Sequence, residues 1–206
     1  MVRLRSGPST LCLTVCIFCL AGSYAYAQQM YTDLEVRVSS LPTLMAKSHD
    51  LSDVLPTSLD TILHDRSICC GKDSALEDSV ERADPLSLKD VASKLQGRHL
   101  LSDGRPIMVL AEFWPIEMVD ALRLVNVLND KHALLMVWNS QIYVVYGVVY
   151  RWVDYSTHHN RPYTVIRKLL LLDTRYSDSR REAEFNHESD DPSKVQGLLM
   201  VTTAPQ

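Results

Sequence analysis

The residues of this chain best suited to covalent chemistry are two adjacent cysteines, Cys69 and Cys70. From Ser74 onward, apolar residues recur at helical spacing with acidic residues between them, which predicts a helix that Asp73 or Ser74 can cap. A thiol at a helix N-terminus faces the positive end of the helix dipole, which favours the thiolate that attacks carbonyl carbons and binds metals. Two interpretations follow: a cysteine nucleophile, or a buried or disulfide-bonded cysteine at a helix start.

Residues 1–27 have the features of a secretory signal peptide. Arg3 and Arg5 form a basic start, residues 11–21 form an apolar core, and Ala25-Tyr26-Ala27 fits a small-x-small cleavage site. The core is too short to span a membrane. We therefore expect an exported protein, periplasmic or extracellular, cleaved near Ala27. A lipid-anchored alternative has three candidate residues, none after a convincing small-residue motif: Cys12, Cys16 and Cys19.

The mature chain, residues 28–206, has the length of a single domain with its own core. Removal of Arg3 and Arg5 lowers the formal net charge from -4 to -6, because the signal segment contains no acidic residue. An acidic chain without a basic run is a poor candidate for binding nucleic acid or anionic membranes. Two adjacent cysteines do not form a disulfide framework, although they can close a strained vicinal disulfide or link two chains.

The hydrophobic patterns predict helices in the first half of the chain and strands in the second. The expected helices begin after Pro56 with Thr57 or Ser58 as the cap, after Ser87 as the cap, and at Pro115, the last ending near residue 128. The expected strands are a short one around residues 36–38, then 107–113, 133–138, 142–150, 164–172, 183–185 and 198–203, with Asn139-Ser140 as a turn. Helices followed by an antiparallel sheet indicate the α+β class.

This architecture resembles the papain-like cysteine peptidases, and most closely their small bacterial branch of double-glycine leader peptidases and type III effector proteases. Cys70-Gly71-Lys72-Asp73-Ser74 is similar to the Cys-Gly-Pro-Ala-Ser opening of the cysteine helix in that branch. The resemblance implies that Cys70, rather than Cys69, is the nucleophile. Lys168-Leu169-Leu170-Leu171-Leu172-Asp173-Thr174 looks like the strand that ends in Asp-Pro, which implies Asp173 as the carboxylate that orients the base.

The histidine strand of the family matches this chain in two registers. In the first, Lys131-His132-Ala133-Leu134 is similar to the Gly-His-Ala-Val strand, which implies His132 as the base. In the second, Ser140-Gln141-Ile142-Tyr143 is the histidine strand, so that Gln141 stands at the histidine position. The second register explains the strand order better, because the aspartate strand of the family follows the histidine strand as its neighbour. A glutamine cannot accept and return a proton near neutral pH, so this register implies an inactive peptidase.

Other polar groups in the sequence carry weaker signals. The family's oxyanion-hole glutamine has no counterpart in residues 62–67, where His64 or Ser67 can donate instead. His158, His159 and His187 can supply imidazoles, but a solvated hairpin tip is favoured, and we expect no metal and no cofactor. The charged run 173–182 is expected to be a solvated turn with weak surface ion pairs.

The sequence leaves three hypotheses about function. The first is an exported thiol hydrolase in which Cys70 attacks a peptide or other acyl carbonyl, His132 is base and acid, and Asp173 orients it. The second is a catalytically inactive relative, with Gln141 at the histidine position, that binds a peptide or a protein. The third is an unrelated exported α+β module whose paired cysteines are structural.

Overall fold

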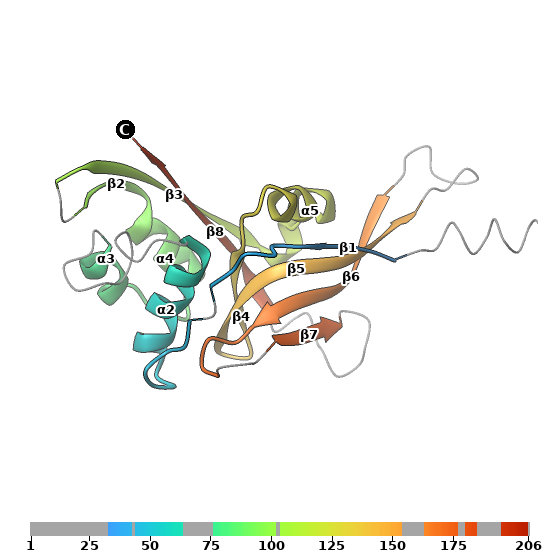
Figure 1. The fold of residues 1–206 in the computed structure, drawn as a ribbon, viewed down its shortest axis with the longest axis horizontal. Helices are drawn as coiled ribbons and strands as arrows, with labels where there is room; N and C mark the ends of the chain where they lie inside the picture. Colours follow the sequence, from blue (N-terminus) through green and yellow to red (C-terminus); the bar gives the residue numbers. More distant parts are fainter. Residues whose placement is uncertain are drawn as a thin grey trace, which may run out of the picture.

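The structure is a computed structural model, and it describes residues 33–42, 44–63, 76–101, 104–153, 163–176, 180–184 and 195–205. Its strands are β1 (Asp33–Arg37), β2 (Gly97–Leu100), β3 (Pro106–Pro115), β4 (Leu134–Trp138), β5 (Gln141–Val153), β6 (Tyr163–Leu172), β7 (Arg180–Glu184) and β8 (Val195–Pro205). Its helices are α2 (Leu51–Leu63), α3 (Glu77–Glu81), α4 (Leu88–Leu95), the 3-10 turn η1 (Ile116–Met118) and α5 (Ala121–Asn129). Figure 1 shows the resulting mixed α+β chain, a large antiparallel sheet with few helices.

The eight strands form one sheet in the order β2-β3-β8-β4-β5-β6-β7, with β1 beside β5. Every pair of neighbouring strands is antiparallel. The long strand β5 pairs with β6 along one edge, while its other edge pairs first with β4 and then with β1. The α+β class expected from the sequence is therefore confirmed. Strands β1 and β3 correspond to the strands expected around residues 36–38 and at 107–113, whereas β2 was not expected.

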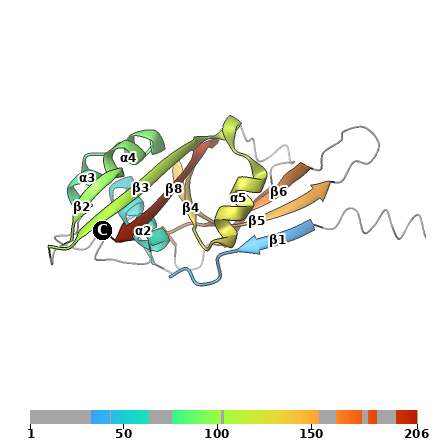
Figure 2. The ribbon, with the colours of Figure 1, turned by 90° about the horizontal axis from the view of Figure 1, so that it is seen from above.

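The helices cover separate parts of the sheet, as Figures 1 and 2 show together. Helix α2 packs against β4, β5 and β8, and α4 packs against β3, β4 and β8. Helix α5 packs against β1, β5 and β6. The side chains of Leu134 to Val137 on β4 are all buried, on both faces of the strand, because successive side chains point to opposite faces. None of the helices in the described ranges is both long and apolar enough to cross a membrane.

Helix α4 and the β4–β5 turn follow their sequence signals. The Ser87 hydroxyl accepts a hydrogen bond from the Asp90 amide at 3.3 Å, as an N-cap does. The apolar face predicted for this helix is buried: Leu88, Val91, Ala92 and Leu95. Asn139 and Ser140 have φ angles of 51° and 58°, which are the positive values that a tight hairpin turn of matching twist requires.

Pro56 lies inside α2 and does not precede it, so the predicted start of this helix is wrong. The helix begins at Leu51, and the amides of Asp53 and Val54 donate to the Asp50 carbonyl. A proline inside a helix removes one backbone hydrogen bond, and α2 nevertheless continues past Pro56 to Leu63. Thr57 is not a cap either, because its hydroxyl donates to the Asp53 carbonyl one turn earlier at 2.7 Å.

Two other helices also begin later than the sequence predicts. Pro115 ends β3, and α5 starts only after Asp120, whose carboxylate accepts from the Leu122 amide at 3.0 Å. Helix α3 begins at Glu77 with Leu76 at its N-cap and no side-chain cap. Asp73 and Ser74, the expected caps, lie outside the described residues. The apolar spacing was nevertheless informative, because the described members of the predicted face are buried: Leu76, Val80 and Ala83.

Candidate functional site

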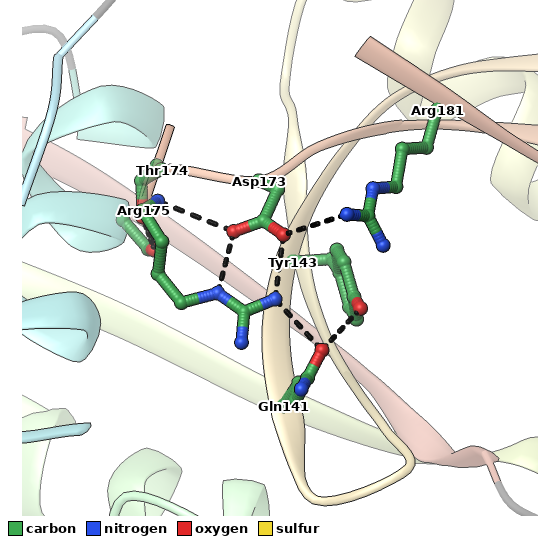
Figure 3. A network of polar contacts seen from close by, with 7 residues as sticks. Gln141, Tyr143, Asp173, Thr174, Arg175 and Arg181 are labelled. Atoms are coloured by element: carbon green, nitrogen blue, oxygen red, sulfur yellow. Dashed lines mark hydrogen bonds and ion pairs between the residues drawn. The ribbon is translucent and has the colours of Figure 1, made fainter. Parts of the chain in front are cut away.

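A network of polar side chains lies where β5 begins and β6 ends. The two strands are antiparallel and pair Val144 with Leu172, so the residue at which β5 begins and the residue that follows β6 lie at the same end of the sheet. These residues are Gln141 and Asp173, and Arg175 lies between them (Figure 3). The sheet register therefore brings together two side chains that are 32 positions apart in the sequence.

Asp173 is the anionic centre of this network, and its side chain is fully buried. Arg175 binds it with two parallel hydrogen bonds, Nε to Oδ1 at 2.7 Å and Nη2 to Oδ2 at 2.5 Å. The Arg175 amide also donates to Oδ1 at 3.2 Å. A second guanidinium, that of Arg181, comes within 3.9 Å of Oδ2. A planar fork on a carboxylate is the strongest form of this ion pair, so the geometry around Asp173 is well defined.

Arg175 remains charged at every pH that the protein can experience. Its side chain is only 12% exposed. The hydrogen bonds that Arg175 donates to Asp173 raise the pKa of Arg175 above its ordinary value, against the opposing effect of burial, and the negative charge of Asp173 adds to the rise. The guanidinium also lies near two aromatic rings, at 5.8 Å from the Tyr143 ring centre and 5.6 Å from that of Tyr176.

Gln141 completes the network at the start of β5. Its Oε1 accepts hydrogen bonds from Arg175 Nη2 at 2.7 Å and from the Tyr143 hydroxyl at 2.6 Å (Figure 3). A guanidinium can only donate, so the Gln141 atom that faces Arg175 must be the oxygen. This fixes the orientation of the amide, so that its NH₂ group does not take part in the contact with Arg175 Nη2.

Helix α2 and the segment before it contact the residues that follow Asp173. The hydroxyls of Ser58 and Thr174, both buried, lie 3.0 Å apart. The Ala46 amide donates to the Thr174 carbonyl at 2.8 Å. Before α2, the ring of His49 lies 5.0 Å from that of Tyr176. The residues that follow Asp173 are therefore held by the helical half of the chain as well as by the sheet.

Proton transfer near neutral pH is not within the chemistry of this network. Arg175 is a permanent cation and Gln141 has no titratable group, so neither can act as a general base. The remaining carboxylate, that of Asp173, is committed to two hydrogen bonds with a guanidinium. The arrangement can instead orient an amide and a cation toward a bound group.

His132 lies at a different place in the fold, and the structure does not bring it to Asp173. It precedes β4, whereas the far end of β4, Trp138, pairs with Gln141. His132 and Trp138 are six residues apart, which at the rise of a β-strand corresponds to about 20 Å. The exposed His132 lines a cavity of about 340 Å³ with residues from α2, β8 and two loops: Ser40, Ile62, Leu63, Asp130, Lys131, Val201, Thr202 and Thr203.

Cys69 and Cys70 lie outside the described residues, as do His64, Ser67, His158, His159 and His187. The predicted Cys70–His132–Asp173 arrangement as a whole therefore stays a prediction. Helix α3 begins seven positions after Cys70. Within the described ranges, no group of three His, Cys, Asp or Glu side chains is placed to hold a metal ion.

Arg175 is the residue of this network that the sequence patterns did not single out. The run 173–182 was expected to be a solvated turn with weak surface pairs, and this is wrong for its first members, since Asp173 is fully buried and Arg175 nearly so. A usable signal was present, because Asp173 directly follows four consecutive leucines, Leu169 to Leu172, which are buried in β6. A charge at the end of a buried strand requires a partner close by.

No protein-family model, curated protein or solved structure matches this chain. The papain-like resemblance therefore remains a hypothesis, and the function has to be argued from the geometry described above.

Proposed function

We propose that this chain is an exported module of papain-like type that lacks hydrolase activity and binds peptides at the site of Gln141. The observation that carries the proposal is the contact of Arg175 with both Gln141 and Asp173, on the two neighbouring strands β5 and β6. In the papain-like resemblance, the base begins one strand and the orienting carboxylate ends the next. Gln141 and Asp173 occupy these two positions here, which supports the second of the two registers.

The chemistry of the two side chains supports the inactive form of the site. A thiol nucleophile needs a neighbouring base that takes its proton and later returns it. At the position that faces Asp173, this chain has an amide. The carboxylate that would orient a base is bound instead by the guanidinium of Arg175, which cannot take up a proton.

The inactivity can be tested on the mature protein, residues 28–206, with and without prior reduction. We expect no cleavage of fluorogenic peptides above the level of Cys70→Ala. We also expect Cys70, labelled by iodoacetamide between pH 5 and 9, to react with the pKa of an ordinary thiol, about 8.5. Cleavage that Cys70→Ala abolishes, or a thiol pKa well below this value, would contradict the inactive form of the site.

The binding role can be tested with peptides selected from a random library against the mature protein, their affinities measured by fluorescence anisotropy. We expect Gln141→Ala to weaken them by about tenfold, the effect of one charge-assisted hydrogen bond. The matched control is Gln196→Ala, since Gln196 is exposed on β8. Selected peptides that bind both variants equally would show that the site of Gln141 is not the binding site.

A second candidate function is a thiol hydrolase that uses Cys70 and His132 without Asp173. The favouring observation is that His132 and Leu63, the last residue of α2, line the same cavity, and the cysteine segment follows Leu63 in the sequence. For this candidate, His132→Gln must remove both the cleavage of peptides and the fast alkylation of Cys70. The proposed binding module requires that His132→Gln changes neither.

A further inference from the structure

The side chains of Arg175 and Gln141 both carry N–H groups that the network does not use. Arg175 makes its side-chain hydrogen bonds through Nε and Nη2, so that Nη1 makes none within the described part of the chain. Gln141 makes its hydrogen bonds through Oε1, so that its Nε2 makes none there either. Each of these two nitrogens carries two N–H bonds, and together they offer four donors.

The two nitrogens lie on the same side of the contact between Arg175 and Gln141, as Figure 3 shows. Neither of them is among the buried side-chain atoms that lack a hydrogen-bond partner in the described part of the chain. Both residues are partly exposed, Arg175 to 12% of its side chain, so solvent reaches this part of the network. The orientation of the two nitrogens is fixed by the hydrogen bonds on the other side of each group, so a ligand would find them already in place.

The charge around these donors favours an anion. Arg175 and Asp173 neutralise each other, and Arg181 adds a positive charge on a half-exposed side chain at 3.9 Å from the Asp173 carboxylate. Asp173, Arg175 and Arg181 together carry a net charge of +1. The attraction is local, because the mature chain as a whole is acidic and charges beyond about 10 Å are screened at ordinary salt.

The geometry points to a carboxylate-binding site formed by Arg175 Nη1 and Gln141 Nε2 that takes an acidic peptide. This inference rests on the proposed peptide-binding function and specifies its ligand. The two carboxylate oxygens match one guanidinium nitrogen and one amide nitrogen, in charge-assisted hydrogen bonds. The carboxylate belongs either to the C-terminus of the peptide or to an Asp or Glu side chain, which share this chemistry.

Four pools of random hexapeptides, passed over the immobilised mature protein, test the inference. Two pools have a free C-terminal carboxylate and two a C-terminal amide, and one pool of each kind lacks Asp and Glu. Mass spectrometry identifies the retained peptides. We expect the amidated pool without Asp and Glu to be retained at least about tenfold less than pools with a carboxylate. The comparison of the two mixed pools shows whether the C-terminus or a side chain supplies the carboxylate.

Gln141→Glu is the most informative variant. A glutamate can still accept hydrogen bonds from Arg175 and Tyr143, so the network remains, but it replaces the donor Nε2 by an anion. We expect it to lower the retention of acidic peptides at least about tenfold. Arg181→Gln removes the second cation near Asp173 from a half-exposed side chain and should lower retention several-fold. The charge-matched control is Arg123→Gln, which removes an equally exposed arginine on α5 and should leave the retention of acidic peptides unchanged.

The outcomes separate this inference from the proposed function. If all four pools are retained equally and Gln141→Glu binds them as before, the carboxylate site is wrong, while loss of binding in Gln141→Ala would still support peptide binding. If no pool is retained, both are overturned. If acidic peptides are retained in a Gln141-dependent way but are also cleaved, the carboxylate site stands and the inactive module does not.

Discussion

Ser58 on α2 and Thr174 after β6 lie 116 positions apart in the sequence, yet their hydroxyls are 3.0 Å apart in the core. Both side chains are fully buried. Either hydroxyl can donate to the other, and this pair joins the helical half of the chain to the residue next to Asp173. A buried hydroxyl pair of this kind stabilises the fold mainly because each group would otherwise be left without a partner.

Replacing both members of this pair should therefore cost less than the sum of the two single replacements. We expect Ser58→Ala and Thr174→Val each to lower the free energy of unfolding by about 1–3 kcal/mol, since each leaves one buried hydroxyl unsatisfied. The double variant should lose less than the sum. Urea unfolding of the four proteins measures the coupling, with Ser93→Ala on the exposed face of α4 as the control, where the loss should stay below about 0.5 kcal/mol. Additive losses would show that the two hydroxyls do not depend on each other.

The ion pair of Asp173 with Arg175 should be necessary for the fold as well as for the site. Asp173→Asn leaves a nearly buried guanidinium without its anion, and the loss of one member of a buried pair costs about 3–5 kcal/mol. We expect the midpoint of urea unfolding to fall accordingly. Asp33→Asn is the matched control, because it makes the same change in a half-exposed pair with Arg151 and should cost no more than about 1 kcal/mol. Equal losses in the two variants would argue against a structural role for Asp173.

Sequence patterns predicted the local elements of this fold because their causes are local. Ser87 caps α4 and the four apolar residues of that helix face the core, as the 3.6-residue period indicates. The turn Asn139-Ser140 separates two apolar runs, which is the signature of a hairpin. In these places a few neighbouring residues decide the conformation, and no distant contact competes with them.

The features that the sequence did not reveal depend on contacts between distant residues. Strand β8, at the C-terminal end, lies between β3 and β4, and β1 continues the edge of β5 beyond β4. Neither position follows from hydrophobic spacing, because any half-buried strand can pair with several neighbours. Arg175 is only two positions from Asp173, but its contact with Gln141 depends on the pairing of β5 with β6, which hydrophobic spacing does not reveal.

Gly197 is a position where no other residue should be tolerated. It lies in β8 opposite Pro115, with φ at +155°, and a Cβ there would come within 2.3 Å of the Trp114 carbonyl oxygen. We expect Gly197→Ala to lower the free energy of unfolding by about 2 kcal/mol or more, because the backbone of β3 must move. Gly104→Ala separates this clash from backbone strain, since Gly104 has φ at +83° but nothing within 4 Å of a Cβ. Its cost should be about 1–2 kcal/mol, measured by urea unfolding. A loss at Gly197 no larger than at Gly104 would contradict the predicted clash.

The pair of Glu112 and Arg123 should make the stability of the protein depend on pH in the acidic range. Burial alone would raise the pKa of Glu112, but the hydrogen bonds and the positive charge of Arg123 outweigh burial and lower it. A carboxyl group with a lowered pKa in the folded state adds stability above its pKa in the unfolded chain. This stability is lost as the pH falls through the folded-state pKa. The window therefore begins near the ordinary value of 4.5 and extends below it.

Arg123→Gln should accordingly show a flatter loss of stability than the wild type between about pH 5 and pH 3. The two side chains are about half exposed, so the difference should not exceed about 1 kcal/mol. The Arg123 guanidinium also lies 4.2 Å from the Trp114 ring, and the loss of this contact should lower stability equally at every pH. Urea unfolding at several pH values distinguishes the slope from this constant offset. Lys94→Gln removes the same charge from the exposed face of α4, and it should leave the wild-type slope unchanged if the Glu112 pair is its cause.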